Sequence, residues 1–250
     1  MLRIFITLFY LCHLSLASGL SPITINSGFY QPESDLIDQI LQEVSKRTKI
    51  TIHHDVLPHK RALIHANKGL SDGDAARILD INTLYTNLIP IPVPSHSLDL
   101  MVVTNKKIHI NKPSDLQKYH VGIINGMRIA ILMVEKTQPR SLVKGNAQNI
   151  MDMLAMDHLD VVIINKMGLL ADIEHIKEKS LYLKTTPLIS RPLYMQLHKK
   201  NRAYIPIIQR ALETMHEDGT WQKIQKDFYR PFESKIRNCF IPLEEASSLQ

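Results

Sequence analysis

The sequence predicts an α/β fold, in which helices flank mixed, mostly parallel sheets. Segments with strand patterns alternate with segments of helical spacing along most of the chain, which is the order that such sheets require. The continuous apolar run Val161–Ile164 is typical of a parallel strand that is buried on both faces. With 250 residues, 44% of them hydrophobic, the chain is long enough for one large domain or for two lobes.

The first residues predict a targeting segment. A charged start, Met1-Leu-Arg3, precedes the apolar run Ile4–Leu16, and the small residues Ala17-Ser18-Gly19 follow it. This order is typical of a secretory signal peptide, here over residues 1–17, and it predicts a periplasmic mature protein. The apolar run is too short for a transmembrane helix, and an uncleaved anchor is the alternative interpretation. Cleavage would leave Cys239 as the single cysteine, without an intramolecular partner.

Charge and motifs exclude several classes of function. The formal net charge is +6, but the basic residues are scattered and aromatic residues make up only 6% of the chain. A nucleic-acid partner is therefore not expected, whereas a bias towards anionic ligands is. The sequence contains no His-Glu-x-x-His, no Gly-x-Ser-x-Gly and no glycine-rich phosphate loop. We expect no metal, no cofactor and no catalytic residues.

The first third of the chain predicts strand, helix and strand in succession. Ile23–Ser27 alternates like a half-buried strand and Gly28 ends it. Apolar residues at helical spacing follow, namely Ile37, Ile40, Leu41 and Val44. Ile50–Val56 is again strand-like.

The stretch from Pro58 to Arg77 predicts a helix, a turn and a short strand. Pro58 suits the first turn of a helix and Gly69 suits its end. Ser71–Asp74 has turn residues, and the small side chains of Ala75 and Ala76 follow. Arg77 comes directly after them and offers five donors to a carboxylate or phosphate.

The rest of the sequence predicts two extended connections between lobes, with strands and helices between them and two helices after them. Alternating prolines in Asn87–Pro94 exclude a helix and lead into the strand Leu98–Thr104, and Leu181–Pro192 is the second connection. Between them we expect strands over Tyr119–Ile124 and Val161–Ile164, and helices over Met127–Lys136, Asn149–Met156 and Lys166–Lys179. Helices over Ala203–His216 and Thr220–Phe228 follow, and residues 233–250 are expected to form a poorly ordered tail.

Five motifs in this order resemble extracellular solute-binding proteins of family 3, which serve polar amino acid transporters. They are Pro58-x-x-Arg-Ala-Leu63, Lys68-Gly-x-x-Asp-Gly73 with Arg77 four residues on, Pro113-Ser-Asp-Leu116 before Val121-Gly-Ile-Ile-Asn-Gly126, Leu159-Asp-Val-Val-Ile-Ile-Asn165, and Asp218-Gly-Thr-Trp221. The resemblance covers roughly residues 22–229.

This resemblance implies a two-lobed, type II periplasmic-binding-protein fold with a ligand cleft between the lobes. Lobe 1 is expected over residues 22–100 and 190–232, and lobe 2 over residues 103–188. The implied function is closure of a monomer on a small anionic or zwitterionic ligand, for delivery to an ABC-type permease or to a sensor.

In open parallel sheets, ligands bind outside the carboxyl ends of the strands and at helix N-termini. This rule selects ten candidate ligand-binding residues, namely Phe29, Tyr30, Arg61, Asp72 and Arg77 in lobe 1, and Asn125, Gly126, Met127, Arg128 and Asn165 in lobe 2. We expect Arg77 to hold a ligand carboxylate with its paired donors. The alternatives are that Phe29 packs on the core, that Arg61 lies along its helix, and that Gly126 is only a turn glycine.

Two departures from the family pattern bear on the ligand. Amino acid binders resemble one another in a Ser/Thr-x-x-x-Arg segment and in an acidic residue near position 165, whereas this chain has Asp74-Ala-Ala-Arg77 and Asn165. A neutral amide does not neutralise a buried ammonium, so a free α-amino acid is disfavoured. Some two-lobed relatives are dehydratases of small carboxylated rings, and that alternative would use Asp72 or His59 as general acid.

We predict that the exported protein lacks residues from Met1 to about Ala17, because the apolar run ends at small residues that suit cleavage. Mass spectrometry of the protein from the periplasmic fraction measures the N-terminus. Exported protein with an intact Met1 would contradict the signal peptide.

Overall fold

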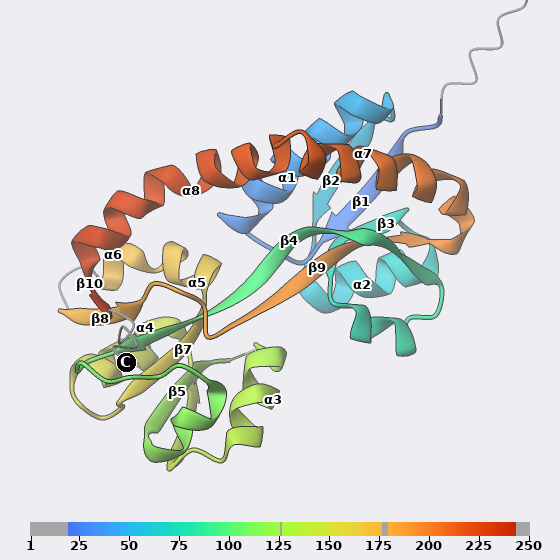
Figure 1. Ribbon diagram of the computed structural model, residues 1–250. Coiled ribbons are helices and arrows are strands. Elements are labelled where there is room, and N and C mark those ends of the chain that lie inside the picture. The colour runs from blue at the N-terminus through green and yellow to red at the C-terminus, as the bar shows by residue number, and fades with distance from the viewer. Residues whose placement is uncertain (1–19, 126, 177–179, 244–250) are drawn as a thin grey trace, which may run out of the picture.

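The structure, a computed structural model, describes residues 20–125, 127–176 and 180–243. The predicted signal peptide lies outside this range. The described residues form helices around a mixed ten-stranded sheet, whose main path runs β2-β1-β3-β9-β4-β7-β5-β6, with β8 and β10 beside it (Figure 1). The predicted α/β class is therefore confirmed. Within the described chain, no helix is both long and apolar enough to cross a membrane.

The first lobe is built on three parallel strands. Strand β1 (Ile23–Ser27) pairs with β2 (Ile52–Val56) on one side and with β3 (Gly73–Arg77) on the other. Helices α1 (Glu33–Thr48), α2 (His59–Lys68) and α7 (Ile205–Glu217) cover these strands, and short 3-10 helices span Leu79–Thr83 and Lys199–Tyr204. Most of the apolar side chains of α1 and α7 share one core cluster with β1 and β3.

The second lobe repeats this plan with its own core. Strands β5 (His120–Ile124), β6 (Ser141–Gly145) and β7 (Val161–Asn165) are parallel, with β5 in the middle. The other elements of the lobe are a 3-10 helix (Pro113–Lys118) and helices α3 (Arg128–Thr137), α4 (Ala147–Ala155), α5 (Lys166–Ala171) and α6 (Ile173–Ile176). Two apolar clusters pack on the strands of this lobe, separate from the core of the first lobe.

Two long antiparallel strands join the lobes. Strand β4 (Leu88–Thr104) takes in both the proline-rich segment and the predicted strand after it, with register shifts near Pro90 and Pro94. It pairs with β9 (Ile189–His198) in lobe 1 and with β7 in lobe 2. Where the two strands pass from one lobe to the other, Asp99 accepts hydrogen bonds from Ser97 Oγ at 2.9 Å and from Ser190 Oγ at 2.6 Å.

Two parts of the second lobe differ from the sequence prediction. The edge strand β6 was not predicted, because Ser141–Gly145 is short and only half-buried and so lacks a clear apolar period. The predicted helix over Lys166–Lys179 is two shorter helices within the described residues, α5 and α6, because α5 ends at Ala171 and Asp172 separates it from α6.

The prediction of a tail over residues 233–250 is wrong for the part that the structure describes. Helix α8 (Thr220–Cys239) continues through Pro231, and β10 (Phe240–Leu243) pairs with β8 (Leu181–Lys184) in lobe 2. A proline inside a helix costs about 3 kcal/mol. Packing of the apolar side chains of α8 offsets this cost, since Phe228, Phe232 and Ile236 all pack on the lobe 1 core.

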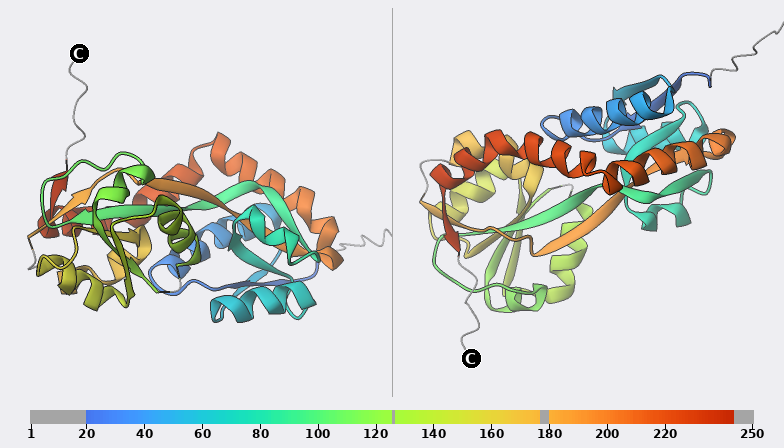
Figure 2. Two further views of the ribbon diagram at one scale, coloured as in Figure 1. Left: turned by 90° about the horizontal axis from the view of Figure 1, so that it is seen from below. Right: turned by 45° about the horizontal axis from the view of Figure 1, so that its top comes forward.

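Helix α8 therefore forms a third connection between the lobes (Figure 2). Ile236 contacts the core of lobe 1 and also a core cluster of lobe 2, and Cys239 and Phe240 belong to the second cluster. Lys235 on this helix forms an ion pair of 3.3 Å with Glu174 of α6.

We predict that Phe240→Ala lowers the free energy of unfolding by about 3 kcal/mol, because it removes a buried aromatic ring that fastens α8 to lobe 2. Urea denaturation of the purified protein measures this loss. The neighbouring Ile241 is 46% exposed, and Ile241→Ala should change stability by less than about 0.5 kcal/mol. Equal stability of the two variants would show that β10 does not hold the helix.

Candidate functional site

The carboxyl ends of the parallel strands gather the candidate residues at two edges. Because β1 and β3 are parallel neighbours, the residues after Ser27 and those at Arg77 share one edge of lobe 1. Strands β5 and β7 likewise end together in lobe 2, at Ile124 and Asn165. The start of α1 is turned towards lobe 2, where α5 begins (Figure 1). Met167 and Leu170 of α5 belong to the lobe 1 core cluster, so these two edges lie at the boundary between the lobes.

Arg77 lies at this boundary, but its paired donors are already bound within the protein. Its Nε donates to Asp74 Oδ1 at 2.9 Å and its Nη2 donates to Asp74 Oδ2 at 2.7 Å. This is the bidentate geometry that we expected Arg77 to offer to a ligand carboxylate. The residue lies at the lobe boundary, and in this structure the Asp74 carboxylate accepts from the two donors that we expected a ligand carboxylate to use.

The Asp74 carboxylate is fully buried, which makes the ion pair a structural requirement. Its side chain is 0% exposed, and that of Arg77 is 11% exposed. Burial raises the pKa of Asp74, against the opposing effect of the adjacent Arg77 guanidinium and of the Ala76 N–H. A buried carboxylate without a cation would be strongly destabilising.

His59, at the start of α2, is the nearest partner of Arg77 apart from Asp74. The Nη1 atom of Arg77 lies 3.3 Å from His59 Nδ1, and Nη2 donates to the His59 carbonyl oxygen at 3.2 Å. Desolvation of the ring by the groups packed around it, and the nearby Arg77 cation, lower the pKa of His59 to about 4, so the ring is neutral at pH 7. The rule that ligands bind at helix N-termini selects this position, whereas the sequence pointed to His59 only as a general acid in the enzymatic alternative.

Phe29 provides the apolar wall of this cluster. Its ring centroid lies 4.9 Å from that of His59, in an edge-to-face arrangement, and 6.0 Å from Arg77 Cζ. The ring also packs against the core, as the packing interpretation of Phe29 expects. Tyr30 is 59% exposed and lies next to it in the chain.

Two other candidates in lobe 1 do not join this cluster. Asp72 precedes β3 and so lies about 16 Å from Arg77 along the strand. It accepts hydrogen bonds from Thr24 N at 2.8 Å and Asn201 Nδ2 at 2.8 Å. Partial burial opposes its ionisation, but these bonds and Lys200 outweigh burial and lower the pKa of Asp72. Asp72 therefore lies at the opposite end of β3 from Arg77, away from the cluster of Phe29 and His59. Arg61 is exposed on α2.

In lobe 2, the described candidates lie at the ends of β5 and β7. Asn125 is exposed and follows β5, while Met127 is half-buried and precedes α3. Asn165 ends β7 and precedes α5, and its side chain caps no helix N–H. Gly126 lies outside the described residues. Arg128 begins α3, and its side chain is likewise outside the described part.

Lys166, which the sequence analysis did not select, also lies at the lobe boundary. Its Nζ is 3.6 Å from the centroid of the Tyr229 ring on α8, which is cation–π geometry between the lobes. Burial lowers the pKa of Lys166, although the carboxylates of Asp99 and Glu233 oppose the shift. Burial, together with Asp99 and Glu33, raises the pKa of Tyr229. The position of Lys166 directly after an apolar strand is the sequence feature that could have identified it.

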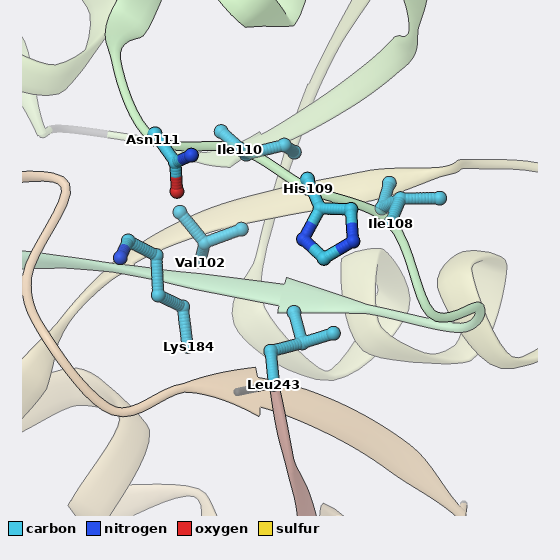
Figure 3. Close-up of a pocket in the computed structure, with 7 residues that line it drawn as sticks. All are labelled: Val102, Ile108, His109, Ile110, Asn111, Lys184 and Leu243. Atoms are coloured by element: carbon cyan, nitrogen blue, oxygen red, sulfur yellow. The ribbon is translucent and has the colours of Figure 1, made fainter. Parts of the chain in front are cut away.

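A small pocket in lobe 2 lies apart from this site. Figure 3 shows it within lobe 2, lined by side chains that include Val102, His109 and Lys184. Its volume is about 10 Å³, which is room for no more than one water. A second indentation, in the lobe 1 core beside Ile37 and His96, has no room for a water molecule. Neither space accommodates a metabolite.

The two residues offered as alternative general acids lie at different ends of lobe 1. His59 lies at the carboxyl end of the lobe 1 strands and Asp72 at the other end. Among the described residues, no group of three or more His, Cys, Asp or Glu side chains is placed to hold a metal ion.

Comparison with known proteins identifies the fold. No protein-family model matches the sequence, and no curated protein is similar to it in sequence. Among solved structures, the GluR0 ligand-binding core in complex with L-glutamate has a TM-score of 0.67 at 10% identity, covering 83% of this chain and 97% of that chain. The unliganded, open L-cystine solute receptor of Neisseria gonorrhoeae has a TM-score of 0.65 at 12% identity, covering 84% and 93%.

A histidine kinase sensor domain similar to periplasmic binding proteins has a TM-score of 0.61 at 10% identity, covering 83% of this chain and 95% of that chain. At such identities these structures show the fold alone. They confirm the two-lobed periplasmic-binding-protein fold that the sequence motifs predicted.

We predict that Arg77→Ala lowers the free energy of unfolding by about 3–5 kcal/mol, because it leaves the buried Asp74 carboxylate without a cation. Urea denaturation measures the change. The double variant Asp74→Ala/Arg77→Ala should be more stable than Arg77→Ala alone, since it removes the stranded charge. Arg61→Ala is the matched control and should lie within about 0.5 kcal/mol of the unmodified protein. Unchanged stability of Arg77→Ala would contradict the ion pair.

Proposed function

We propose that this chain is an exported solute-binding protein whose two lobes close on a small polar ligand that carries a carboxylate. The observation that carries this proposal is that two groups of polar residues, each at the carboxyl ends of parallel strands, lie at the lobe boundary, one on each lobe. One edge presents Phe29, His59 and Arg77, and the other presents Asn165 and Lys166. An apolar wall with a few convergent polar groups is the usual composition of a small-ligand site.

The two pockets described above are too small for the ligand, so we infer that the site forms when the lobes close. A site for a small molecule encloses roughly 300 Å³ or more, far above the size of either pocket. Half-sites on two lobes joined by strands β4 and β9 become one enclosed site when the lobes rotate together. Closure would also remove water from the donors, which strengthens their attraction to an anion.

The charges at the boundary favour an anionic or zwitterionic ligand. Asp74 neutralises most of the Arg77 charge, but one Nη1 hydrogen of Arg77 is not used by a described residue. Lys166 has no carboxylate within ion-pair distance among the described residues, and its ammonium lies on the Tyr229 ring. These groups offer donors to a ligand carboxylate from both lobes.

The wider role that we infer is delivery of the closed, liganded monomer to an ABC-type permease or to a sensor, from a periplasmic location. The sensor domain that shares this fold supports the second destination, and the solute receptor supports a solute-binding role. The predicted signal peptide supports export.

We predict that the mature chain is stabilised by at least one small carboxylated solute in a thermal-shift screen. A ligand at about 100 times its dissociation constant adds about 2.7 kcal/mol to the free energy of unfolding. Small-angle scattering should then show a smaller radius of gyration, because the lobes close, and chromatography should recover the ligand unchanged. Chemical conversion of the ligand would contradict the proposal and favour an enzyme.

A further inference from the structure

The contact with Arg77 fixes the protonation of the His59 ring. A guanidinium has only donors, so the His59 Nδ1 atom, 3.3 Å from Arg77 Nη1, must be the acceptor. The single hydrogen of the neutral imidazole is therefore on Nε2. Because Asp74 holds the Arg77 guanidinium through two hydrogen bonds, the donor that faces Nδ1 is itself fixed in place.

The ring is also held sterically. A Cβ at Gly28 would fall 2.4 Å from His59 Nδ1, so only glycine allows the ring to lie against the chain after β1. The edge of one ring meets the face of the other where Phe29 contacts His59, with an interplanar angle of 82°. His59 is nevertheless exposed, and its Nε2 has no hydrogen-bond partner in the described chain. The structure thus presents an oriented, unused N–H donor at the lobe boundary.

The carboxylates linked to this cluster are already paired. Asp74 binds Arg77, and the buried Glu33 carboxylate lies 3.2 Å from Nε2 of His96, whose ring neighbours Phe29. On the opposite edge, the neutral Asn165 is followed by the cationic Lys166. Beside Lys166, the Asp99 carboxylate accepts hydrogen bonds from two serine hydroxyls, and both Asp99 and Glu233 favour the Lys166 ammonium. The described carboxylates at the boundary thus already face a donor or a cation, and the cluster around His59 offers donors to an oxygen, whereas a lone ammonium is costly to bury.

We propose that His59 is a ligand-binding residue that donates its Nε2–H to an oxygen of the ligand, and that the site takes carboxylates without an ammonium group, of the 2-oxo acid type, in preference to amino acids. This inference rests on the proposed function and narrows its ligand class.

Paired probes that differ in a single group test the ligand class. L-Alanine and pyruvate, L-glutamate and 2-oxoglutarate, and L-phenylalanine and phenylpyruvate each exchange an ammonium for a carbonyl oxygen. Calorimetric titration of the mature protein should show at least one 2-oxo acid binding about tenfold or more tightly than its amino acid. Tighter binding of the amino acid in every pair that binds would overturn the inference while leaving the solute-binding function intact.

Variants then test His59 with the tightest-binding probe. His59→Ala should weaken binding about ten- to a hundredfold, because a hydrogen bond to a charged acceptor is lost. His59→Gln, which retains an N–H donor, should recover part of the affinity. His53→Ala, which removes an exposed histidine of β2, is the control and should bind like the unmodified chain. Equal affinity of His59→Ala and this control would exclude His59 from the site.

A measurement without ligand separates this inference from the proposed function. Long-range ¹H–¹⁵N NMR spectra of the unliganded protein at pH 7 should show the His59 hydrogen on Nε2. A hydrogen on Nδ1 would overturn the inference whichever solute binds. If none of the six probes binds while the Nε2 hydrogen is observed, the choice of a 2-oxo acid is overturned, and the broader thermal-shift screen decides the solute-binding function.

Discussion

The buried ion pair between Asp74 and Arg77 is the interaction on which the lobe 1 half of the site depends. It holds the carboxyl end of β3, and through the His59 carbonyl it also ties the first turn of α2 to that strand. Because the same guanidinium faces His59 Nδ1, the pair sets the direction in which the imidazole donates. A contact that stabilises the fold therefore also decides which chemistry the lobe boundary presents to a ligand.

The connections between the lobes limit how they can move. Strands β4 and β9 form one ladder across the boundary, and the hydrogen bond that Ser190 Oγ of β9 donates to Asp99 of β4 joins the two strands there. Helix α8 adds a third link, with side chains in the cores of both lobes. Rotation of the lobes must then bend or shift α8, and Pro231, which lacks one helical hydrogen bond, is the natural place for such a bend.

The contrast between Asp72 and Asp74 shows how far local sequence carries the assignment of a site. Both residues lie in one turn-like stretch, and either aspartate is a reasonable candidate for a ligand-binding acid. The strand begins at Gly73, so Asp72 lies at the amino end with Thr24 and Asn201, while Asp74 is buried against Arg77. A shift of two residues along a strand thus separates an outer structural contact from the core of the site.

The sequence by itself determined the alternation of strands and helices, the two extended connections and the motif order, because these follow from side-chain period, proline geometry and turn chemistry within a few residues. From these came the two-lobed fold and the place of Phe29, Arg77 and Asn165 at strand ends. Only the tertiary structure showed that Asp74 accepts two hydrogen bonds from Arg77 and that the Lys166 ammonium lies against the Tyr229 ring. It also showed that α8 continues past Pro231 and leads to a strand in lobe 2. These outcomes depend on burial and on contacts formed only when the chain folds. Most of the partners lie far apart in the sequence, so local sequence patterns do not predict them.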